Sequence, residues 1–152
     1  MMRNLLRIWR RLPLWVHILG AKLVRKKFRV AVAAMIFDEQ GRILLFKHTY
    51  RKYEWGIPAG SLEYGEQPAN AIVRELLEET GMHVQVERLL RAVSAREDRH
   101  ISLIYLCRIM SGDFRPGLEI SEMKYFPPND LPSMLLTEKE LISRIEKERV
   151  IS

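Results

Sequence analysis

One segment near the middle of the chain predicts a helix with a buried face. Residues 68–80 read PANAIVRELLEET, with Pro68 at the first helical position and Gly81 directly after the last. These are the positions that proline and glycine favour at helix ends. At 100° per residue the apolar side chains share one face, and they are Ala69, Ile72, Val73, Leu76 and Leu77. We therefore predict a helix over 68–80 that packs against a core.

The opposite face of this predicted helix carries three glutamates. Glu75, Glu78 and Glu79 stand at positions i, i+3 and i+4, where each like-charge pair destabilises an isolated helix by about a few tenths of a kcal/mol. Hard divalent cations such as Mg²⁺ or Mn²⁺ favour carboxylate oxygens as ligands. Three glutamates alone are typical of a solvated acidic face, so the surrounding residues decide between the two interpretations.

Segments with β-forming composition lie on both sides of the helix. Before it, residues 28–37 and 43–46 flank the turn sequence DEQG, and this pattern predicts a hairpin, followed by a loop over 47–54. The elements expected after the helix are strands over 84–93, 101–109 and 123–126, a loop over 110–120 and a final helix over 138–150. Strands on both sides of a central helix predict α/β or α+β layering.

The charge is divided unevenly along the 152 residues, a length typical of one domain. The first 29 residues hold nine basic side chains and no acid, whereas the other 123 hold 16 basic and 19 acidic residues, a net charge of −3. This division argues against a nucleic-acid polymer as partner. The single cysteine, Cys107, excludes an intramolecular disulfide and fits a cytoplasmic protein.

Residues 1–27 are predicted to form a basic amphipathic extension ahead of a domain over 28–152. Apolar residues alternate with arginines in the first part, and the longest stretch without a formal charge, residues 12–21, is shorter than the roughly 20 residues of a spanning helix. Two interpretations stay open: peripheral contact with an anionic membrane surface, or packing on the domain or on a second subunit. We favour packing against protein, at the interface of a homodimer.

The stretch over 60–82 resembles the signature of the Nudix hydrolase family, G-x5-E-x7-R-E-U-x-E-E-x-G-U, where U is a bulky aliphatic residue. Every fixed position is filled at the required spacing, by Gly60, Glu66, Arg74, Glu75, Leu76, Glu78, Glu79, Gly81 and Met82. The order of the flanking strands extends the resemblance over roughly residues 28–150. The resemblance implies an α/β/α sandwich with a mixed sheet and a loop–helix–loop catalytic box. It also implies divalent-metal-dependent hydrolysis of a diphosphate bond in a nucleoside diphosphate linked to another group.

The same resemblance implies roles for individual residues. The metal ligands, for Mg²⁺ or Mn²⁺, are Glu75, Glu78, Glu79 and the backbone carbonyl of Ala59. The residues that brace the loop against the helix are Gly60, Glu66, Arg74 and Gly81. The general base comes either from the box, as Glu75, or from a later loop, as Glu119 or Glu122. We slightly favour Glu122 over Glu119 within that loop.

The basic and aromatic segment before the box is expected to bind the part of the substrate that does not contact metal. Its candidates are His48, Tyr50, Arg51 and Tyr53; the alternative is a solvated loop. The sequence PAG over 58–60 is similar to some ADP-ribose-cleaving members and favours ADP-ribose or a related sugar nucleotide. A proline that often follows the box in that subgroup is missing here, where residues 96–98 read RED. The alternatives are a house-cleaning nucleoside triphosphate pyrophosphohydrolase and a catalytically silent nucleotide-binding regulator.

Overall fold

The computed structural model describes Pro13, residues 28–95 and residues 100–151. In this part of the chain the strands form two sheets, a four-stranded one in the order β4-β1-β6-β5 and a three-stranded one in the order β3-β2-β7. The strands are β1 (Arg29–Ile36), β2 (Ile43–His48), β3 (Trp55–Gly56), β4 (Ala59–Ser61), β5 (His83–Ala95), β6 (His100–Ser111) and β7 (Ile120–Phe126). Strand β1 pairs parallel with β6 and antiparallel with β4, so the larger sheet is mixed.

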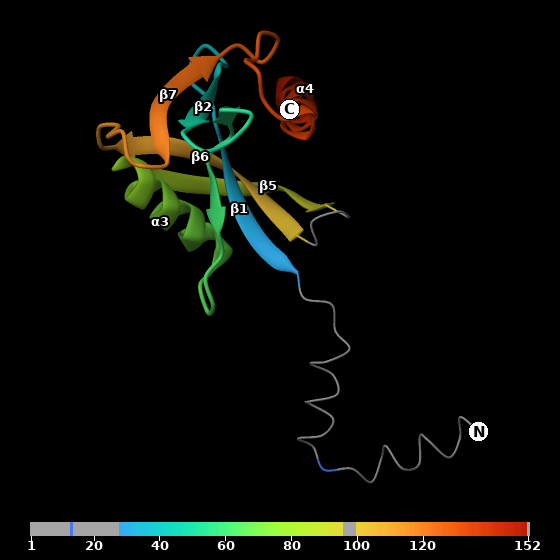
Figure 1. Ribbon diagram of the computed structural model, residues 1–152. Helices are drawn as coiled ribbons and strands as arrows, with labels where there is room; N and C mark the ends of the chain where they lie inside the picture. The colour runs from blue at the N-terminus through green and yellow to red at the C-terminus, as the bar shows by residue number, and fades with distance from the viewer. Residues whose placement is uncertain (1–12, 14–27, 96–99, 152) are drawn as a thin grey trace, which may run out of the picture.

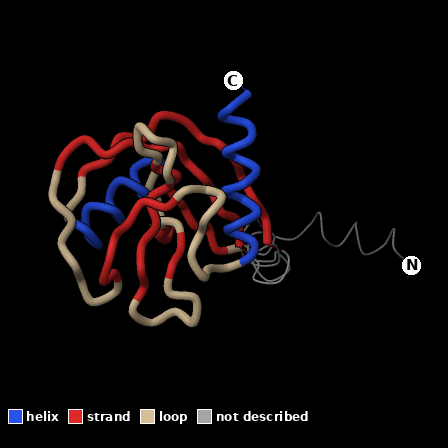
Figure 2. The backbone as a smooth tube through the Cα atoms, turned by 90° about the horizontal axis from the view of Figure 1, so that it is seen from above, coloured by secondary structure: helices blue, strands red, loops and turns tan. Residues whose placement is uncertain are grey.

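Two helices, α3 (Pro68–Thr80) and α4 (Leu136–Ile151), lie on opposite sides of the strands (Figure 1 and Figure 2). The alternation of side chains along β1 shows why. Val32, Ala34 and Ile36 pack in the cluster that contains the buried side chains of α3. Ala33 and Met35, which point the other way, pack in the cluster that contains those of α4. The predicted α/β/α sandwich with a mixed sheet is therefore confirmed.

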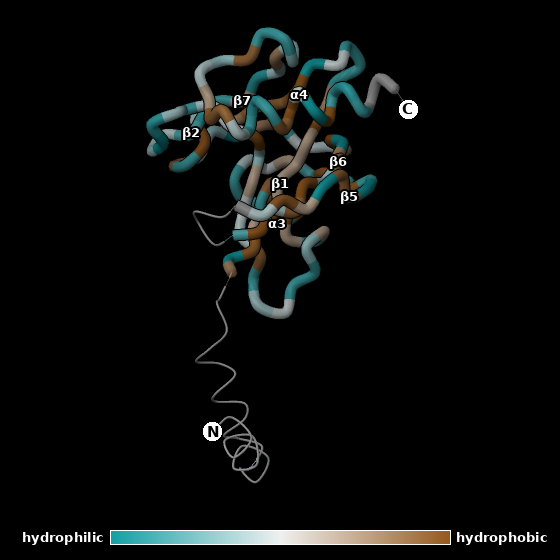
Figure 3. The backbone as a smooth tube through the Cα atoms, turned by 90° about the vertical axis from the view of Figure 1, so that its right-hand side faces the viewer, coloured by the Kyte–Doolittle hydropathy of each residue, from teal (hydrophilic) through white to brown (hydrophobic). Residues whose placement is uncertain are grey.

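Helix α3 has the predicted bounds. Pro68 occupies the start, and Gly81 ends the helix in the left-handed conformation, with φ 77° and its N–H donating to the Leu77 carbonyl. Ile72 and Leu76 are fully buried, but Leu77, which was expected in the core, is exposed. Figure 3 shows the hydrophobic segments gathered between α3 and β1 and hydrophilic ones in the outer loops.

The predicted hairpin between the first two strands is wrong. The turn forms, since the Asp38 carboxylate accepts hydrogen bonds from the backbone N–H groups of Gln40 and Arg42 and Gly41 has φ 75°. Beyond a single bridge, however, β1 and β2 belong to different sheets. The reason is that β4 and β6 occupy both edges of β1, while β2 pairs with β3 and β7.

The later elements match the sequence predictions within a few residues. Strands β5, β6 and β7 and helix α4 extend the predicted segments by one to three residues at most of their ends, which shortens the expected loop over 110–120 to residues 112–119. The predictions for residues 1–27 fall, apart from Pro13, outside the described residues. Within the described ranges, no helix combines the length and the apolar character needed to cross a membrane.

Candidate functional site

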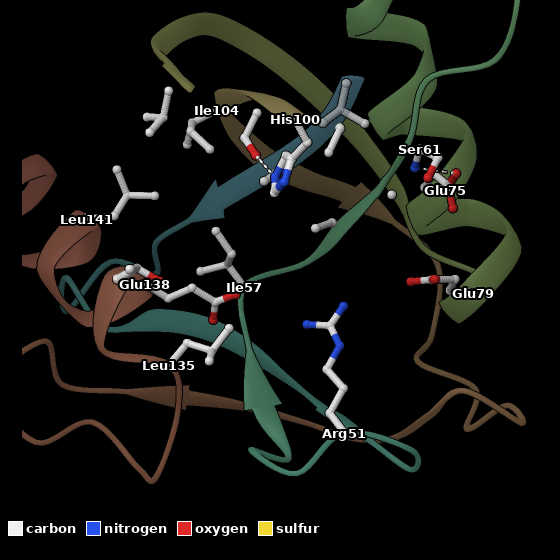
Figure 4. Close-up of a pocket in the computed structure, with 18 of the residues that line it drawn as sticks. Arg51, Ile57, Ser61, Glu75, Glu79, His100, Ile104, Leu135, Glu138 and Leu141 are labelled. Carbon is white, nitrogen blue, oxygen red and sulfur yellow. Dashed lines mark hydrogen bonds between the residues drawn. The ribbon is translucent and has the colours of Figure 1, made fainter. Parts of the chain in front are cut away.

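A cleft of about 860 Å³ is lined by all four strands of the larger sheet and by α4, and its volume is within the range typical of small-molecule sites. Figure 4 shows how its lining is divided: Glu75 and Glu79 of α3 at one end, Glu138 of α4 at the other, and Arg51 between them. The cleft is therefore acidic at one end, with a cation near its centre.

Glu75 is held against the strand that precedes the box. Its carboxylate accepts a hydrogen bond from the Ser61 backbone N–H at 3.1 Å and another from Arg74 at 3.1 Å. A Cβ on Gly60 would lie 2.1 Å from Glu75 Cγ, far inside contact distance. Residue 60 must therefore lack a side chain for Glu75 to reach this position.

Arg74 joins the loop to the helix. Its Nε and Nη2 atoms donate to the two carboxylate oxygens of Glu66 at 3.0 Å each, and Nη2 also donates to the Ser61 carbonyl at 3.0 Å. The hydrogen bond from Arg74 lowers the pKa of Glu66. A bidentate pair of this kind holds both side chains in one orientation. Through these contacts Arg74 connects helix α3 with the segment that precedes it. Arg74 also donates to Glu78 at 3.2 Å, on the exposed side of the helix.

Glu79 has more acidic than basic neighbours. Its pKa is raised to about 7, first by burial and then by the carboxylates of Glu75, Glu119 and Glu78; the guanidinium of Arg51 acts in the opposite direction. A carboxyl group with three acidic neighbours and one cationic neighbour is stabilised in its ionised form by a further bound cation. Glu79 is thus the electrostatic centre of the acidic end.

The donor set at this end fits a hard divalent cation, since it consists of carboxylate oxygens. Over residues 28–95 and 100–151, however, no three His, Cys, Asp or Glu side chains are gathered closely enough to hold a metal ion. Arg74 holds Glu75 and Glu78 in this arrangement. Binding of a cation by all three glutamates therefore requires at least Glu78 to exchange its contact with Arg74. Ala59, the fourth expected ligand, lines the cleft beside Gly60.

The two loop candidates for the general base occupy different places. Glu119 lines the cleft, and its loop is fixed by Thr49, whose N–H donates to the Glu119 carbonyl at 3.0 Å. Glu122 lies opposite Lys47 in the β2–β7 ladder and accepts a hydrogen bond from its Nζ at 3.0 Å; it is not among the cleft-lining residues. The geometry therefore favours Glu119, reversing the preference drawn from the sequence.

Only two of the four residues expected to bind substrate line the cleft. Arg51 and Tyr50 line the cleft, whereas Tyr53 does not. His48 is buried, 3% exposed, and is not among the cleft-lining residues. Sequence reasoning missed Glu138, whose pKa is raised by burial against the opposing effects of Arg51 and the Ile57 backbone N–H. No local signal marks Glu138, because only the docking of α4 brings it to the cleft.

His48 predicts a loss of stability in acid. Burial, with a further contribution from Arg51, lowers its pKa from 6.5 to about 4. The unfolded chain therefore takes up a proton near pH 6.5 while the folded chain does not, so the stability associated with the neutral imidazole is complete above pH 6.5 and is lost as the pH falls toward 4. Urea unfolding of His48→Gln at pH 7 and pH 5 should show a smaller decrease in the free energy of unfolding than the wild type. The control His83→Gln changes an exposed histidine and should show the same decrease in the free energy of unfolding as the wild type. An equal decrease in all three proteins would contradict the role given to His48.

Comparison with known proteins shows similarity to one family in both sequence and fold. The family model described as "NUDIX domain" matches residues 27–145. An ADP-ribose pyrophosphatase from Methanocaldococcus jannaschii is 31% identical over 128 residues, which cover 77% of this chain and 76% of that protein. An 8-oxo-dGDP phosphatase from Homo sapiens is 30% identical over 118 residues, 74% of this chain but only 36% of the human protein. The crystal structure of a NUDIX hydrolase from Nitrosomonas europaea superposes with a TM-score of 0.74 at 23% identity, covering 84% of this chain and 75% of that one.

Proposed function

The chain belongs to the NUDIX family and is a pyrophosphohydrolase of that family, and we propose that it hydrolyses the diphosphate bond of ADP-ribose or of a related sugar nucleotide. The observation that carries this proposal is the division of the cleft. The carboxylates of Glu75, Glu79 and Glu119 lie at one end and Arg51 lies near the centre. The other end is lined by apolar side chains together with Glu138. A nucleoside diphosphate derivative has a matching division into phosphates and organic groups.

The residues of the acidic end have complementary tasks in this proposal. Glu75, Glu78, Glu79 and the Ala59 carbonyl would hold a divalent cation, which neutralises non-bridging phosphate oxygens and lowers the pKa of a bound water. Arg51 faces this end and pairs with a phosphate of the bound substrate. Glu119, beside Glu79 and outside the Arg74 network, accepts the proton of the attacking water.

Support for the substrate class comes from the relative in M. jannaschii, an ADP-ribose pyrophosphatase that aligns with most of this chain. The second candidate, hydrolysis of an oxidised or ordinary nucleoside polyphosphate, is favoured by the human relative named an 8-oxo-dGDP phosphatase. The third, a nucleotide-binding regulator without activity, would have no use for the cluster of carboxylates around Glu79.

A substrate panel separates these three functions. The purified protein is incubated with excess Mg²⁺, and separately with Mn²⁺, and ADP-ribose, UDP-glucose, dGTP and 8-oxo-dGDP are compared by kcat/KM. We expect ADP-ribose to exceed the other substrates by about tenfold or more, the discrimination typical of a few changed contacts, and to yield AMP and ribose 5-phosphate. A higher kcat/KM for dGTP or 8-oxo-dGDP would select the second function. Tight binding of one compound without turnover of any would select the regulator.

A further inference from the structure

The guanidinium of Arg51 lies between carboxyl groups on two sides of the cleft. Figure 4 shows it between Glu79 of α3 and Glu138 of α4. Its positive charge acts on both of them, since it opposes the rise in the pKa of each carboxyl group. Within residues 28–95 and 100–151, however, Arg51 forms no ion pair with either one. One cation is therefore divided between two carboxyl groups.

Glu138 has an unsatisfied acceptor near Arg51. Its Oε2 atom is buried without a hydrogen bond in the described part of the chain, and a buried acceptor without a partner is destabilising. A Cβ built on Gly56 would lie 3.1 Å from Glu138 Oε2 and 3.2 Å from Arg51 Nη1, so these two atoms approach the same point from different elements. Rotation of the two flexible side chains is therefore enough to bring them into contact.

The other groups that face Glu138 supply no positive charge. His48 of β2 approaches the same point, with its Nε2 atom 3.5 Å from the Cβ position of Gly56. Its pKa is lowered to about 4, first by burial and then by Arg51, so its imidazole is uncharged at neutral pH. Ile57 contributes a backbone N–H. Among the described residues, Arg51 is the cation whose charge acts on Glu138.

An ion pair of Arg51 with Glu79 and one with Glu138 would have opposite consequences for the acidic end. Pairing with Glu79 would place a positive charge where the proposed divalent cation binds, and the two cations would repel each other. Pairing with Glu138 keeps the guanidinium away from Glu79 but still inside the cleft, within reach of a substrate phosphate. The position of Arg51 therefore matters for metal binding as well as for substrate binding.

We propose that Glu138 is a positioning residue, which pairs with Arg51 and holds its guanidinium near the centre of the cleft and away from Glu79. This rests on the proposed function in one respect, the binding of a divalent cation at the acidic end. Glu138 contacts neither that cation nor the reacting atoms, and it acts through Arg51. A substrate phosphate then takes over the guanidinium as a bidentate partner.

Binding of Mn²⁺ to the substrate-free protein tests this role without any turnover. Glu138→Gln removes the charge but keeps the length of the side chain and an oxygen that can accept the Ile57 N–H, so α4 should stay docked; thermal unfolding checks this. We expect the dissociation constant for Mn²⁺, measured from the free-ion signal in electron paramagnetic resonance, to rise about tenfold, because Arg51 moves to Glu79. Glu138→Asp, which keeps the charge, should bind Mn²⁺ as the wild type does.

A double-mutant cycle shows whether Glu138 acts through Arg51. Arg51→Met removes a cation that acts on Glu79, so it should bind Mn²⁺ at least as tightly as the wild type. Adding Glu138→Gln to Arg51→Met should change the dissociation constant by less than about threefold, because the partner of Glu138 is already gone. The matched control, Glu140→Gln, removes the same charge from an exposed position of α4 outside the cleft lining and should match the wild type.

Three results would overturn the positioning role. The first is an equal rise in the dissociation constant with and without Arg51, which would assign Glu138 to the docking of α4 alone. The second is an unchanged affinity in Glu138→Gln. The third is weaker Mn²⁺ binding in Arg51→Met, which would show that Arg51 does not compete with the cation.

The same measurements separate this proposal from the proposed function. If the wild type hydrolyses ADP-ribose but the cycle shows no dependence on Arg51, the positioning role is wrong and the function stands. If the affinities for Mn²⁺ follow the expected pattern while no ADP-ribose is hydrolysed, the positioning role stands and the function is wrong. Failure of the wild type to bind Mn²⁺ overturns the positioning role, because no cation would then compete with Arg51 at the acidic end.

Discussion

Replacing Glu79 by glutamine is expected to lower kcat for ADP-ribose hydrolysis by about 100-fold or more. The side chain keeps its shape but loses the charge that, together with Glu75 and Glu119, makes the end of the cleft acidic. Metal binding should weaken as well, which the signal of free Mn²⁺ in electron paramagnetic resonance reports independently of turnover.

The same substitution should leave the fold as stable as before or more stable. Burial, and then the like charges of its acidic neighbours, raise the pKa of Glu79 to about 7, so removing the carboxylate relieves both the burial of charge and the repulsion. The matched control, Glu140→Gln, changes an exposed glutamate of α4 and should keep wild-type kcat and Mn²⁺ binding. A Glu79→Gln variant with kcat within about threefold of the wild type would show that Glu79 is not part of the catalytic site.

Gly60→Ala should lower kcat by about 100-fold or more by displacing Glu75, with a smaller effect on folding. The new Cβ would lie 2.1 Å from Glu75 Cγ and 2.2 Å from its Cδ, so Glu75 must leave its position against Ser61. Displacement of a catalytic group by about 1 Å can reduce the rate by about 100-fold, and we expect at least that loss in kcat. Overpacking of this kind lowers the free energy of unfolding by about 1–3 kcal/mol.

A matched glycine substitution separates the steric effect from the loss of backbone freedom. At Gly117 the nearest atom to a new Cβ would be a backbone oxygen at 3.5 Å, an ordinary contact distance. Gly117→Ala should therefore keep wild-type kcat, measured with the same substrate as for Gly60→Ala. Normal activity in Gly60→Ala would contradict the position of Glu75 described above.

The catalytic helix could be predicted from sequence because its signals are local. Pro68, Gly81 and the apolar period fix where α3 begins, ends and packs. The strand partners of β1 and β2 could not be predicted. A turn sequence shows that the chain reverses, but not which other strands pair with each of the two. The strands β3 and β4 were missed because segments of two and three residues show no period.

The residues at the acidic end were also easier to identify than those at the other end. Glu75, Glu78 and Glu79 lie within about one turn of one helix, so their spacing alone places them on one face. Glu119 lies in a loop and Glu122 lies three residues later, near the start of β7. Only the pairing of β2 with β7 shows that Glu122 accepts a hydrogen bond from Lys47. Arg51 and Glu138 line the same cleft although they lie far apart along the chain, and no sequence pattern links them.

The most direct test of the central claim is the rate of ADP-ribose hydrolysis as a function of Mg²⁺ concentration, with AMP and ribose 5-phosphate quantified together. We predict no turnover in the presence of EDTA, a rate that saturates as Mg²⁺ is added, and the two products in equal amounts. Equal rates with Mg²⁺ and with EDTA, or no hydrolysis at saturating Mg²⁺, would contradict the proposal that the carboxylates at the end of this cleft support metal-dependent cleavage of the diphosphate bond of ADP-ribose.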